Sequence, residues 1–379
     1  MMLNRQRGTL AINATLAYDT GSPTGLAVYT RELVSRLISG PDRDASIVFT
    51  SSERLQQLAG GRFAGVPEGI VPPHRLNSIK RVIWLNTEFP ALLRKRNVDT
   101  VYSTVPEGLV LHHDQLRNVI TLHDLLPLRY PAHYPKQRYY FGFVLPMVIR
   151  QSSAIVCDSV ATRDDAIRRF GQPRCSMVVI PAGFNSALFH PADLEQVGVE
   201  MQAPYFMFVG DMRPYKNIAR ALSAFAGLSE SNVRFIVAGN LHTRDPAPLL
   251  SLVRELGMED RVVFTDYISD DEVARLYRGA LALVFPSLWE GFGLPPLEAM
   301  ASGCPVITSN VASLPEVCGD AVQYVDPTSV DSIRSAMERI IREPALREDL
   351  RGRGLERAKL FSWDRTAREV WQVLESIRG

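Results

Sequence analysis

The chain has 379 residues, which is too long for one typical hydrophobic core and suits two domains. Its 42 basic and 41 acidic side chains nearly balance, so no overall field would attract nucleic acid. The sequence lacks a membrane-spanning apolar run and a signal-peptide core, and its four cysteines lack metal-binding spacing. We therefore expect a cytoplasmic protein with reduced thiols, no structural zinc and no nucleic-acid partner.

Short apolar runs alternate with helical patterns along the chain, which predicts parallel sheets covered by helices. A turn-rich exit near residue 181 and a stretch without periodicity, from about 187 to 203, separate two halves. The predicted strands are Thr9 to Asn13, Ile47 to Thr50, Thr100 to Ser103, Val119 to Leu122, Ala154 to Cys157, Met177 to Ile180, Tyr205 to Val209, Phe235 to Ala238, Arg261 to Thr265, Leu281 to Phe285, Cys304 to Thr308 and Val322 to Val325.

The first strand is followed by a loop that ends at Gly25, and a helical pattern begins at Leu26. A strand, a glycine loop and a helix N-terminus can direct backbone amides at a phosphate. The spacing is not that of a dinucleotide-binding motif, and an ordinary crossover of a parallel sheet explains the pattern equally well.

Residues 77 to 96 form an amphipathic stretch with a basic outer face. Such a helix can lie on an anionic membrane surface, or it can be a domain helix whose basic face is solvated. We favour the domain helix.

His123 and Asp124 directly follow the strand Val119 to Leu122. Ligands of open parallel sheets bind beyond the carboxyl ends of the strands. A lone histidine is more often structural, but a His-Asp pair at this position favours a role in a site.

The turn after the first strand of the second half carries Arg213 and Lys216. A leaving diphosphate gains charge as its bond breaks, so fixed cations at a strand end suit it. Gly239 and Asn240 end the next strand, and Ile268 follows the one after it.

The stretch from 281 to 309 contains a buried strand, a loop with Gly291 and Gly293, and a helix that begins with prolines. Free loop amides and a helix N-terminus together predict an anion site. Glu290 and Glu298 stand at the two ends of this loop. Because the sequence leaves their separation open, glycoside hydrolysis is not indicated, and we expect them to accept hydrogen bonds from sugar hydroxyls. The structural alternative has Glu298 complementing the helix dipole from the first turn and Glu290 solvated.

The segment from Glu290 to Glu298, with the following AMASGCPVI, resembles the signature of the retaining glycosyltransferases of family four. The phrase TLHDLLPLRYP around His123 is similar to the corresponding segment of bacterial mannosyl- and rhamnosyltransferases of that family. The resemblance implies an α/β protein of the GT-B fold, with two Rossmann-like domains whose parallel sheets face an interdomain cleft. The acceptor-binding domain would be 1–188, joined by the C-terminal helix 362–379, and the nucleotide-sugar-binding domain would be 189–361.

The resemblance also implies roles for individual residues. Glu290 would contact the donor sugar, Glu298 the ribose and Lys216 the diphosphate, with His123 near the reacting carbon. Arg213 is a weaker candidate, because Asp211 stands where the family commonly has arginine. We take His123, Lys216 and Glu290 as the catalytic candidates. The donor-binding candidates are Gly25, Asp124, Arg213, Asn240, Ile268, Gly291, Phe292, Gly293, Leu294 and Glu298.

The implied reaction transfers a hexosyl group, with retention, from a nucleotide diphosphate sugar to a sugar hydroxyl. No DxD pair stands where a metal-bound diphosphate would be expected, so we expect neither a metal nor another cofactor. GDP-mannose is the favoured donor, followed by GDP- or dTDP-rhamnose and then a UDP-hexose.

The implied acceptor is a growing, lipid-linked polysaccharide or O-antigen. Residues 129 to 150, rich in aromatic and basic side chains, could cover the acceptor and touch its lipid at the inner face of the cell membrane, or could form a buried aromatic helix. Two alternatives to a transferase keep the same fold: a non-catalytic nucleotide-sugar-binding protein and an epimerase.

Overall fold

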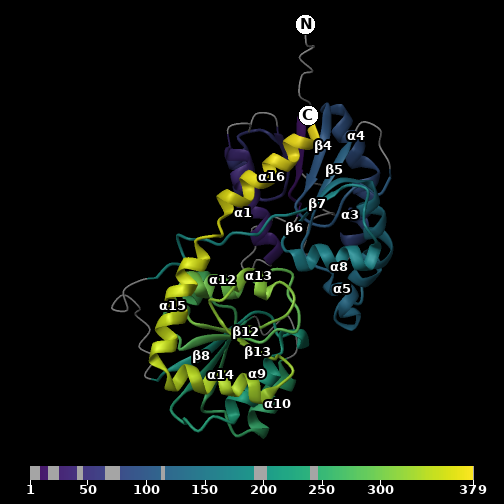
Figure 1. Cartoon of the computed structure of the whole chain (residues 1–379). Coiled ribbons are helices and arrows are strands. Elements are labelled where there is room, and N and C mark those ends of the chain that lie inside the picture. Colours follow the sequence, from purple (N-terminus) through teal and green to yellow (C-terminus); the bar gives the residue numbers. More distant parts are fainter. Residues whose placement is uncertain are drawn as a thin grey trace. The chain divides into compact units, whose positions relative to one another are not determined.

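The computed structural model describes residues 9–15, 25–40, 46–64, 77–111, 116–191, 203–239 and 246–378. The chain divides into two compact units (Figure 1). The first comprises Met1–Gly183 and Trp363–Gly379, and the second comprises Phe184–Ser362. Asn240, a candidate for donor binding, lies outside the described residues. Within those ranges, no helix is both long and apolar enough to cross a bilayer.

The first unit is built on a parallel sheet with the strand order β3-β2-β1-β4-β5-β6-β7. Its central strands are buried almost throughout, because helices cover both faces and leave no strand face to water. The strands are β1 (Thr9–Asn13), β2 (Ser46–Phe49), β3 (Phe63–Ala64), β4 (Val98–Ser103), β5 (Arg117–Leu122), β6 (Ser152–Cys157) and β7 (Ser176–Val179).

The helices of the first unit include the last helix of the chain, α16 (Trp363–Arg378), which packs beside α1 (Gly25–Ser39) (Figure 1). The Tyr29 and Trp363 rings meet edge to face at 5.3 Å, and Arg36 pairs with Asp364 at 2.7 Å. The other helices are α2 (Glu53–Ala59), α3 (Asn77–Asn86), α4 (Glu88–Lys95), α5 (Leu126–Arg129), the 3-10 turn η3 (Pro131–His133), α6 (Gln137–Tyr139), the π-helical turn η4 (Tyr140–Val144), α7 (Leu145–Gln151) and α8 (Val160–Phe170).

The amphipathic stretch 77 to 96 forms two helices, α3 and α4, rather than one. A proline ring clashes with the carbonyl four residues earlier, so Pro90 prevents a continuous helix through Asn86. The apolar side chains of the two helices, Trp84, Leu85, Phe89 and Leu93, belong to a core cluster of the unit. This packing supports the domain-helix interpretation over the membrane-surface one.

The second unit contains a parallel sheet with the strand order β10-β9-β8-β11-β12-β13. In both sheets the order reverses between the first strand of the unit and the fourth, which is the topological switch point of a Rossmann-like fold. The strands are β8 (Tyr205–Val209), β9 (Arg234–Ala238), β10 (Val262–Thr265), β11 (Ala282–Phe285), β12 (Val306–Ser309) and β13 (Gln323–Val325).

The second unit also has helices on both faces of its sheet (Figure 1). They are the 3-10 turn η6 (Pro214–Lys216), α9 (Ile218–Ala226), α10 (Ala247–Glu255), α11 (Asp270–Gly279), α12 (Leu294–Ala301), α13 (Leu314–Cys318), α14 (Val330–Arg342) and α15 (Pro344–Ala358). Every strand expected from the sequence is present with ends within two residues, and the expected class of fold is confirmed. The sequence analysis missed β3, which at two residues is too short to show a pattern.

Candidate active site

Lys216 lies in the turn that follows β8, beside the switch point of the second unit. Asn217, next in the chain, adopts a left-handed conformation with φ of 64°. Its side-chain amide donates to the carbonyl of Pro286, just beyond β11, at 2.9 Å and to that of Pro327, just beyond β13, at 2.7 Å. The backbone amide of Leu288 also donates to the carbonyl of Tyr215 at 2.8 Å. The Lys216 turn is therefore fixed to the loop after β11.

Lys216 and Glu290 form an ion pair between these two loops. The Lys216 Nζ lies 2.8 Å from Oε1 and 3.0 Å from Oε2 of Glu290, and the two side chains are only 13% and 10% exposed. Removing one partner of such a pair would leave the other charged and poorly solvated. The fold thus brings two of the predicted site residues, 74 positions apart in sequence, into direct contact.

The glycine loop from 290 to 293 is fixed by hydrogen bonds from the side chain of Ser313. The buried Ser313 hydroxyl shares its hydrogen between the carbonyls of Glu290, at 3.0 Å, and Phe292, at 2.6 Å. Gly293 has a φ of 116°, and a Cβ there would lie 3.0 Å from Leu314 Cδ2, so only glycine suits this position. These contacts turn the loop into the N-terminus of α12, of which Leu294 is the first residue.

The Phe292 side chain is buried and packs edge to face against Phe361, with ring centroids 6.0 Å apart. The ring of Phe292 is therefore engaged in packing, and a contact between Phe292 and a ligand would involve its backbone. Gly291 and Gly293 also offer only backbone groups.

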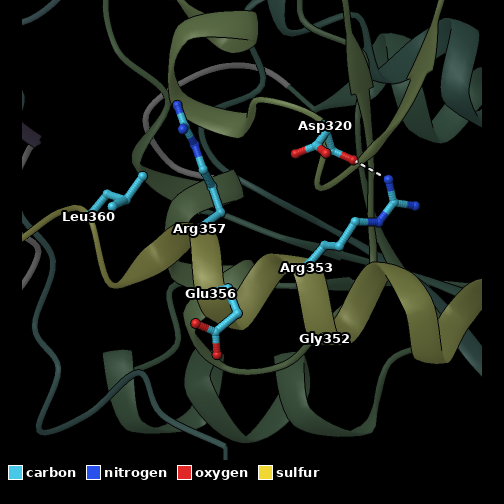
Figure 2. A pocket seen from close by; sticks show the side chains of 6 residues that line it. All are labelled: Asp320, Gly352, Arg353, Glu356, Arg357 and Leu360. Carbon is cyan, nitrogen blue, oxygen red and sulfur yellow. Dashed lines mark hydrogen bonds between the residues drawn. The ribbon is translucent and has the colours of Figure 1, made fainter.

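Two arginines of α15 hold α13, the helix that begins directly after Ser313. Arg357 donates from Nε to the carbonyl of Val317 at 2.9 Å and from Nη2 to that of Glu316 at 2.5 Å, which caps the last turn of α13. Arg353 donates to the carbonyl of Asp320 at 2.7 Å (Figure 2). These side chains line a hollow of about 370 Å³ that contains none of the predicted site residues. We assign it a structural role behind the loop.

Glu298 stands in the second turn of α12, because the helix begins at Leu294. The prediction that it occupies the first helical turn was wrong, since Pro295 and Pro296 fill that turn. Burial, and then repulsion by Asp270, raise the pKa of Glu298 to about 8. No described side chain supplies a cation or a hydrogen bond to its carboxyl group, so a ligand hydroxyl would find an acceptor there.

Arg213 is paired with the residue that departs from the family pattern. Its Nε lies 3.1 Å from Asp211 Oδ2, and its backbone amide donates to Asp211 Oδ1 at 3.2 Å. Asp211 therefore offsets much of the Arg213 charge. Ile268 lies just before the capping box of α11, formed by Ser269 and Glu272, and is partly buried.

In the first unit, His123 follows β5 and is buried against Asp158, which follows β6. Its Nδ1 lies 2.5 Å from Asp158 Oδ2, and its Nε2 lies 2.8 Å from the carbonyl oxygen of Thr104. A carboxylate and a carbonyl both accept hydrogen bonds, so this arrangement suits an imidazolium with a proton on each nitrogen. Burial alone would lower the His123 pKa, but the Asp158 carboxylate outweighs it and the pKa is raised.

The other two predicted residues of the first unit have local roles. Asp124 Oδ1 accepts the backbone N–H of Leu126 at 2.9 Å, so it shapes the entry to α5. Gly25 begins α1, and a Cβ there would meet no atom within 4 Å. Packing in the described part of the chain does not demand glycine at this position, and its phosphate-facing role stays a prediction.

The sequence analysis missed three residues that position the candidates: Asp158, Asn217 and Ser313. Asp158 could have been found by the rule that selected His123, because it directly follows the apolar run Ala154 to Cys157. Asn217 and Ser313 carry no comparable signal, since they act on backbone carbonyls that only the fold brings near. Among the residues with described positions, no cluster of three or more His, Cys, Asp or Glu could hold a metal ion.

Two Rossmann-like units in one chain are the architecture of the GT-B fold. A sucrose-phosphate synthase from Thermosynechococcus elongatus has the same fold, with a TM-score of 0.80 at 21% identity, covering 98% of this chain and 99% of that one.

The chain belongs to glycosyltransferase family 4. The model of that name matches residues 23–188, and the glycosyl transferases group 1 model matches residues 190–357. The O-antigen chain mannosyltransferase B of Escherichia coli is 30% identical over 365 residues, covering 90% of this chain and 93% of the relative. The O-antigen chain mannosyltransferase RfbU of Salmonella typhimurium is 29% identical over 331 residues, covering 85% and 89%.

Proposed function

We propose that this glycosyltransferase moves a mannosyl group from a nucleotide diphosphate donor, GDP-mannose first, to a sugar hydroxyl of a lipid-linked glycan, with retention of configuration. The names of the two O-antigen relatives support the sugar and the class of acceptor. The observation that carries the proposal is the part-buried Lys216–Glu290 pair at the switch point of the second unit. In this pair, a cation that would suit phosphate lies next to a carboxylate that would accept hydrogen bonds from sugar hydroxyls.

The leaving diphosphate is the group that the second unit suits best. As the bond between the anomeric carbon and the phosphate oxygen breaks, negative charge grows on that oxygen. Lys216, the amides of the 291–294 loop and the N-terminus of α12 would stabilise this charge. The acceptor oxygen would bond to the anomeric carbon on the same face, and its proton would pass to the departing phosphate.

Glu290 and Glu298 would bind different parts of the donor. Glu290 is held beside Lys216, so a diphosphate that engages Lys216 leaves the sugar hydroxyls within its reach. Glu298 lies further along α12 in a setting that disfavours its charge, and two ribose hydroxyls would give its carboxylate the hydrogen-bond donors that it lacks. Ile268 and Asn240 remain candidates for the nucleoside end of the donor.

His123 would act as a fixed cation of the first unit. Asp158 would keep the ring charged and oriented, and a sugar oxygen could take the N–H that now points at the Thr104 carbonyl. Asp158 is then a positioning residue, because it would act through His123 rather than touch the donor.

A donor panel tests the proposal directly. The full chain would be incubated with GDP-mannose, dTDP-rhamnose and UDP-glucose, with and without a lipid-linked acceptor, and the released nucleoside diphosphate would be measured. We expect acceptor-dependent release of GDP that survives EDTA. Binding without turnover of any donor would favour the non-catalytic alternative, and conversion without an acceptor would favour the epimerase.

A further inference from the structure

The helical run from Gln137 to Gln151 in the first unit presents an apolar stripe to solvent. It consists of α6, the π-helical turn η4 and α7. Along it, Tyr139, Phe143 and Met147 recur every four residues and are 54%, 72% and 44% exposed. Scattered exposed apolar residues are normal, but large ones repeated along one helical face usually mark an interaction surface.

The opposite side of the same helical run packs against the hydrophobic core. Leu145, Val148 and Ile149 pack against Ile120 and Ile155 of the sheet. The inward face therefore already supplies the apolar contacts that hold the run on the unit. Tyr139, Phe143 and Met147 are not members of this core cluster.

Basic side chains flank the stripe, and acidic ones are absent from the surrounding sequence. No Asp or Glu occurs between residues 125 and 157, while the same stretch contains Arg129, Lys136, Arg138 and Arg150. Arg129 pairs with Asp165 at 3.0 Å. Lys136, Arg138 and Arg150 are exposed, and the described residues include no ion pair with any of them. We call Lys136, Arg138, Tyr139, Phe143, Met147 and Arg150 the aromatic-basic face.

We propose that the aromatic-basic face docks on a bilayer surface that contains anionic lipid. Arg138 lies over the Tyr139 ring, 4.7 Å from its centroid, so a cation and an aromatic ring are offered at the same depth. Aromatic side chains favour the headgroup region, and basic side chains next to them are attracted by anionic headgroups. A stable protein partner would need roughly 800 Å² of surface on each side, far more than three side chains provide.

This inference goes beyond the proposed reaction, because it depends neither on the donor nor on turnover. It selects one of the two alternatives for residues 129 to 150, contact with lipid, and it makes the π-helical turn part of the docking surface. π-helical turns are rare and occur often at functional positions. Gly142, within the turn, leaves the backbone beside Phe143 uncovered by a side chain.

The helix pair α3 and α4 supplies a matched comparison in the same unit. Arg94, Lys95 and Arg96 are as exposed as the bases of the aromatic-basic face, but the neighbouring Phe89 and Leu93 are buried. Ile83 of α3 is 56% exposed, but it stands alone, so the helix pair has bases with one exposed apolar side chain, whereas the aromatic-basic face has bases with three. Leu58 of α2, 44% exposed like Met147, is a matched apolar control.

The test is flotation of the full chain with vesicles, in low and high salt. We expect binding to an equal mixture of phosphatidylcholine and phosphatidylglycerol, and none to phosphatidylcholine alone. The double variant Phe143→Ser with Met147→Ser should weaken binding at least tenfold. The triple variant Lys136→Gln, Arg138→Gln and Arg150→Gln should weaken it by about fivefold per charge. The triple variant Arg94→Gln, Lys95→Gln and Arg96→Gln and the variant Leu58→Ser should bind like the parent.

Two outcomes would overturn the inference. One is a parent protein that fails to bind the mixed vesicles, or face variants that bind them as well as the parent does. The other is a parent that elutes as a dimer which the Phe143 and Met147 variant dissociates, because the face would then be covered by a second copy. Turnover with a water-soluble acceptor, measured on the same preparations, should be equal in the face variants and the parent. Loss of turnover in every preparation, with vesicle binding intact, would instead count against the proposed function.

Discussion

The two units have the same order of their first strands, but the charged side chains at their strand ends are paired in different ways. In the first unit, His123 is tied at both nitrogens to protein acceptors, and its charge depends on a neighbouring carboxylate, Asp158. In the second, Lys216 pairs with Glu290, and the loop after β11 leads into the N-terminus of α12. Under the proposed function, the first unit would supply a fixed cation, while the ion pair of the second unit would rearrange when a donor binds.

The largest expected effect is the loss of activity when Lys216 of the second unit is replaced. Lys216→Ala removes the cation of the leaving group and should lower kcat/KM by about 10²- to 10³-fold, since one such contact typically contributes about 2.7 to 4 kcal/mol to the transition state. Initial rates at saturating acceptor would measure it. Lys359→Ala, at an exposed pair with Glu356, is the control and should be silent. Arg213→Ala should cost less than Lys216→Ala, because Asp211 already offsets its charge.

The fold of the Lys216 variant needs its own check, because Glu290 is left without its partner. The double variant Lys216→Ala with Glu290→Gln should recover the melting temperature without recovering activity. Near-normal turnover in Lys216→Ala would remove Lys216 from the mechanism.

Substitution of Glu290 and of Glu298 should change different kinetic constants, each by about tenfold. Glu290→Gln loses contacts to the sugar as its ring flattens, which should mainly lower kcat. Because the change also removes the ion pair with Glu290, which competes with phosphate for Lys216, the bare nucleoside diphosphate should bind as well as before or more tightly. Glu298→Gln should mainly raise the donor KM and weaken nucleoside diphosphate binding. Equal loss of nucleotide binding in calorimetry would mean that the pair is one structural unit.

Asp158→Asn tests whether the first unit offers a charged ring. The His123 pKa is raised in the parent, so the ring stays charged below that pKa and loses its charge as the pH rises through it. Without the carboxylate the pKa should fall, and the alkaline limb of the kcat profile should move to lower pH by about one unit or more. Asp124→Asn is the matched control and should move it less, because Asp124 raises this pKa least of the groups involved. Identical profiles would give Asp158 a purely structural role.

The smallest expected effect concerns stability. The folded chain holds the Glu298 proton up to about pH 8, whereas the unfolded chain releases it near its ordinary pKa. Between these values the folded state binds more protons, so stability should fall as pH rises, by at most about 1.4 kcal/mol per pH unit. Glu298→Gln should lack this slope and melt above the parent at alkaline pH. Melting curves across that range would check it, and parallel curves for the two proteins would contradict it.

The sequence predicted the strands and the class of fold because buried strands leave long apolar runs and the glycine-proline loop is dense in conformational constraints. It could not predict that Lys216 and Glu290 touch, since their loops meet only through the parallel pairing of β8 and β11. It misplaced Glu298 by a turn because prolines mark a helix start without fixing its first residue. Phe143 was recognised as part of an aromatic segment, but its outward direction follows from which residues the sheet below buries.

The side chain of Asn217 has a consequence for how donor preference can change in such a protein. Both of its amide hydrogens are used at two strand ends, and its oxygen accepts from Arg220 at 2.8 Å. The turn that carries Lys216 is therefore held rigidly on the sheet, and Lys216 would bind the diphosphate, the part that all nucleotide diphosphate sugars share. A new donor could then be accommodated without disturbing the catalytic cation, by substitutions confined to the nucleoside and sugar ends of the site.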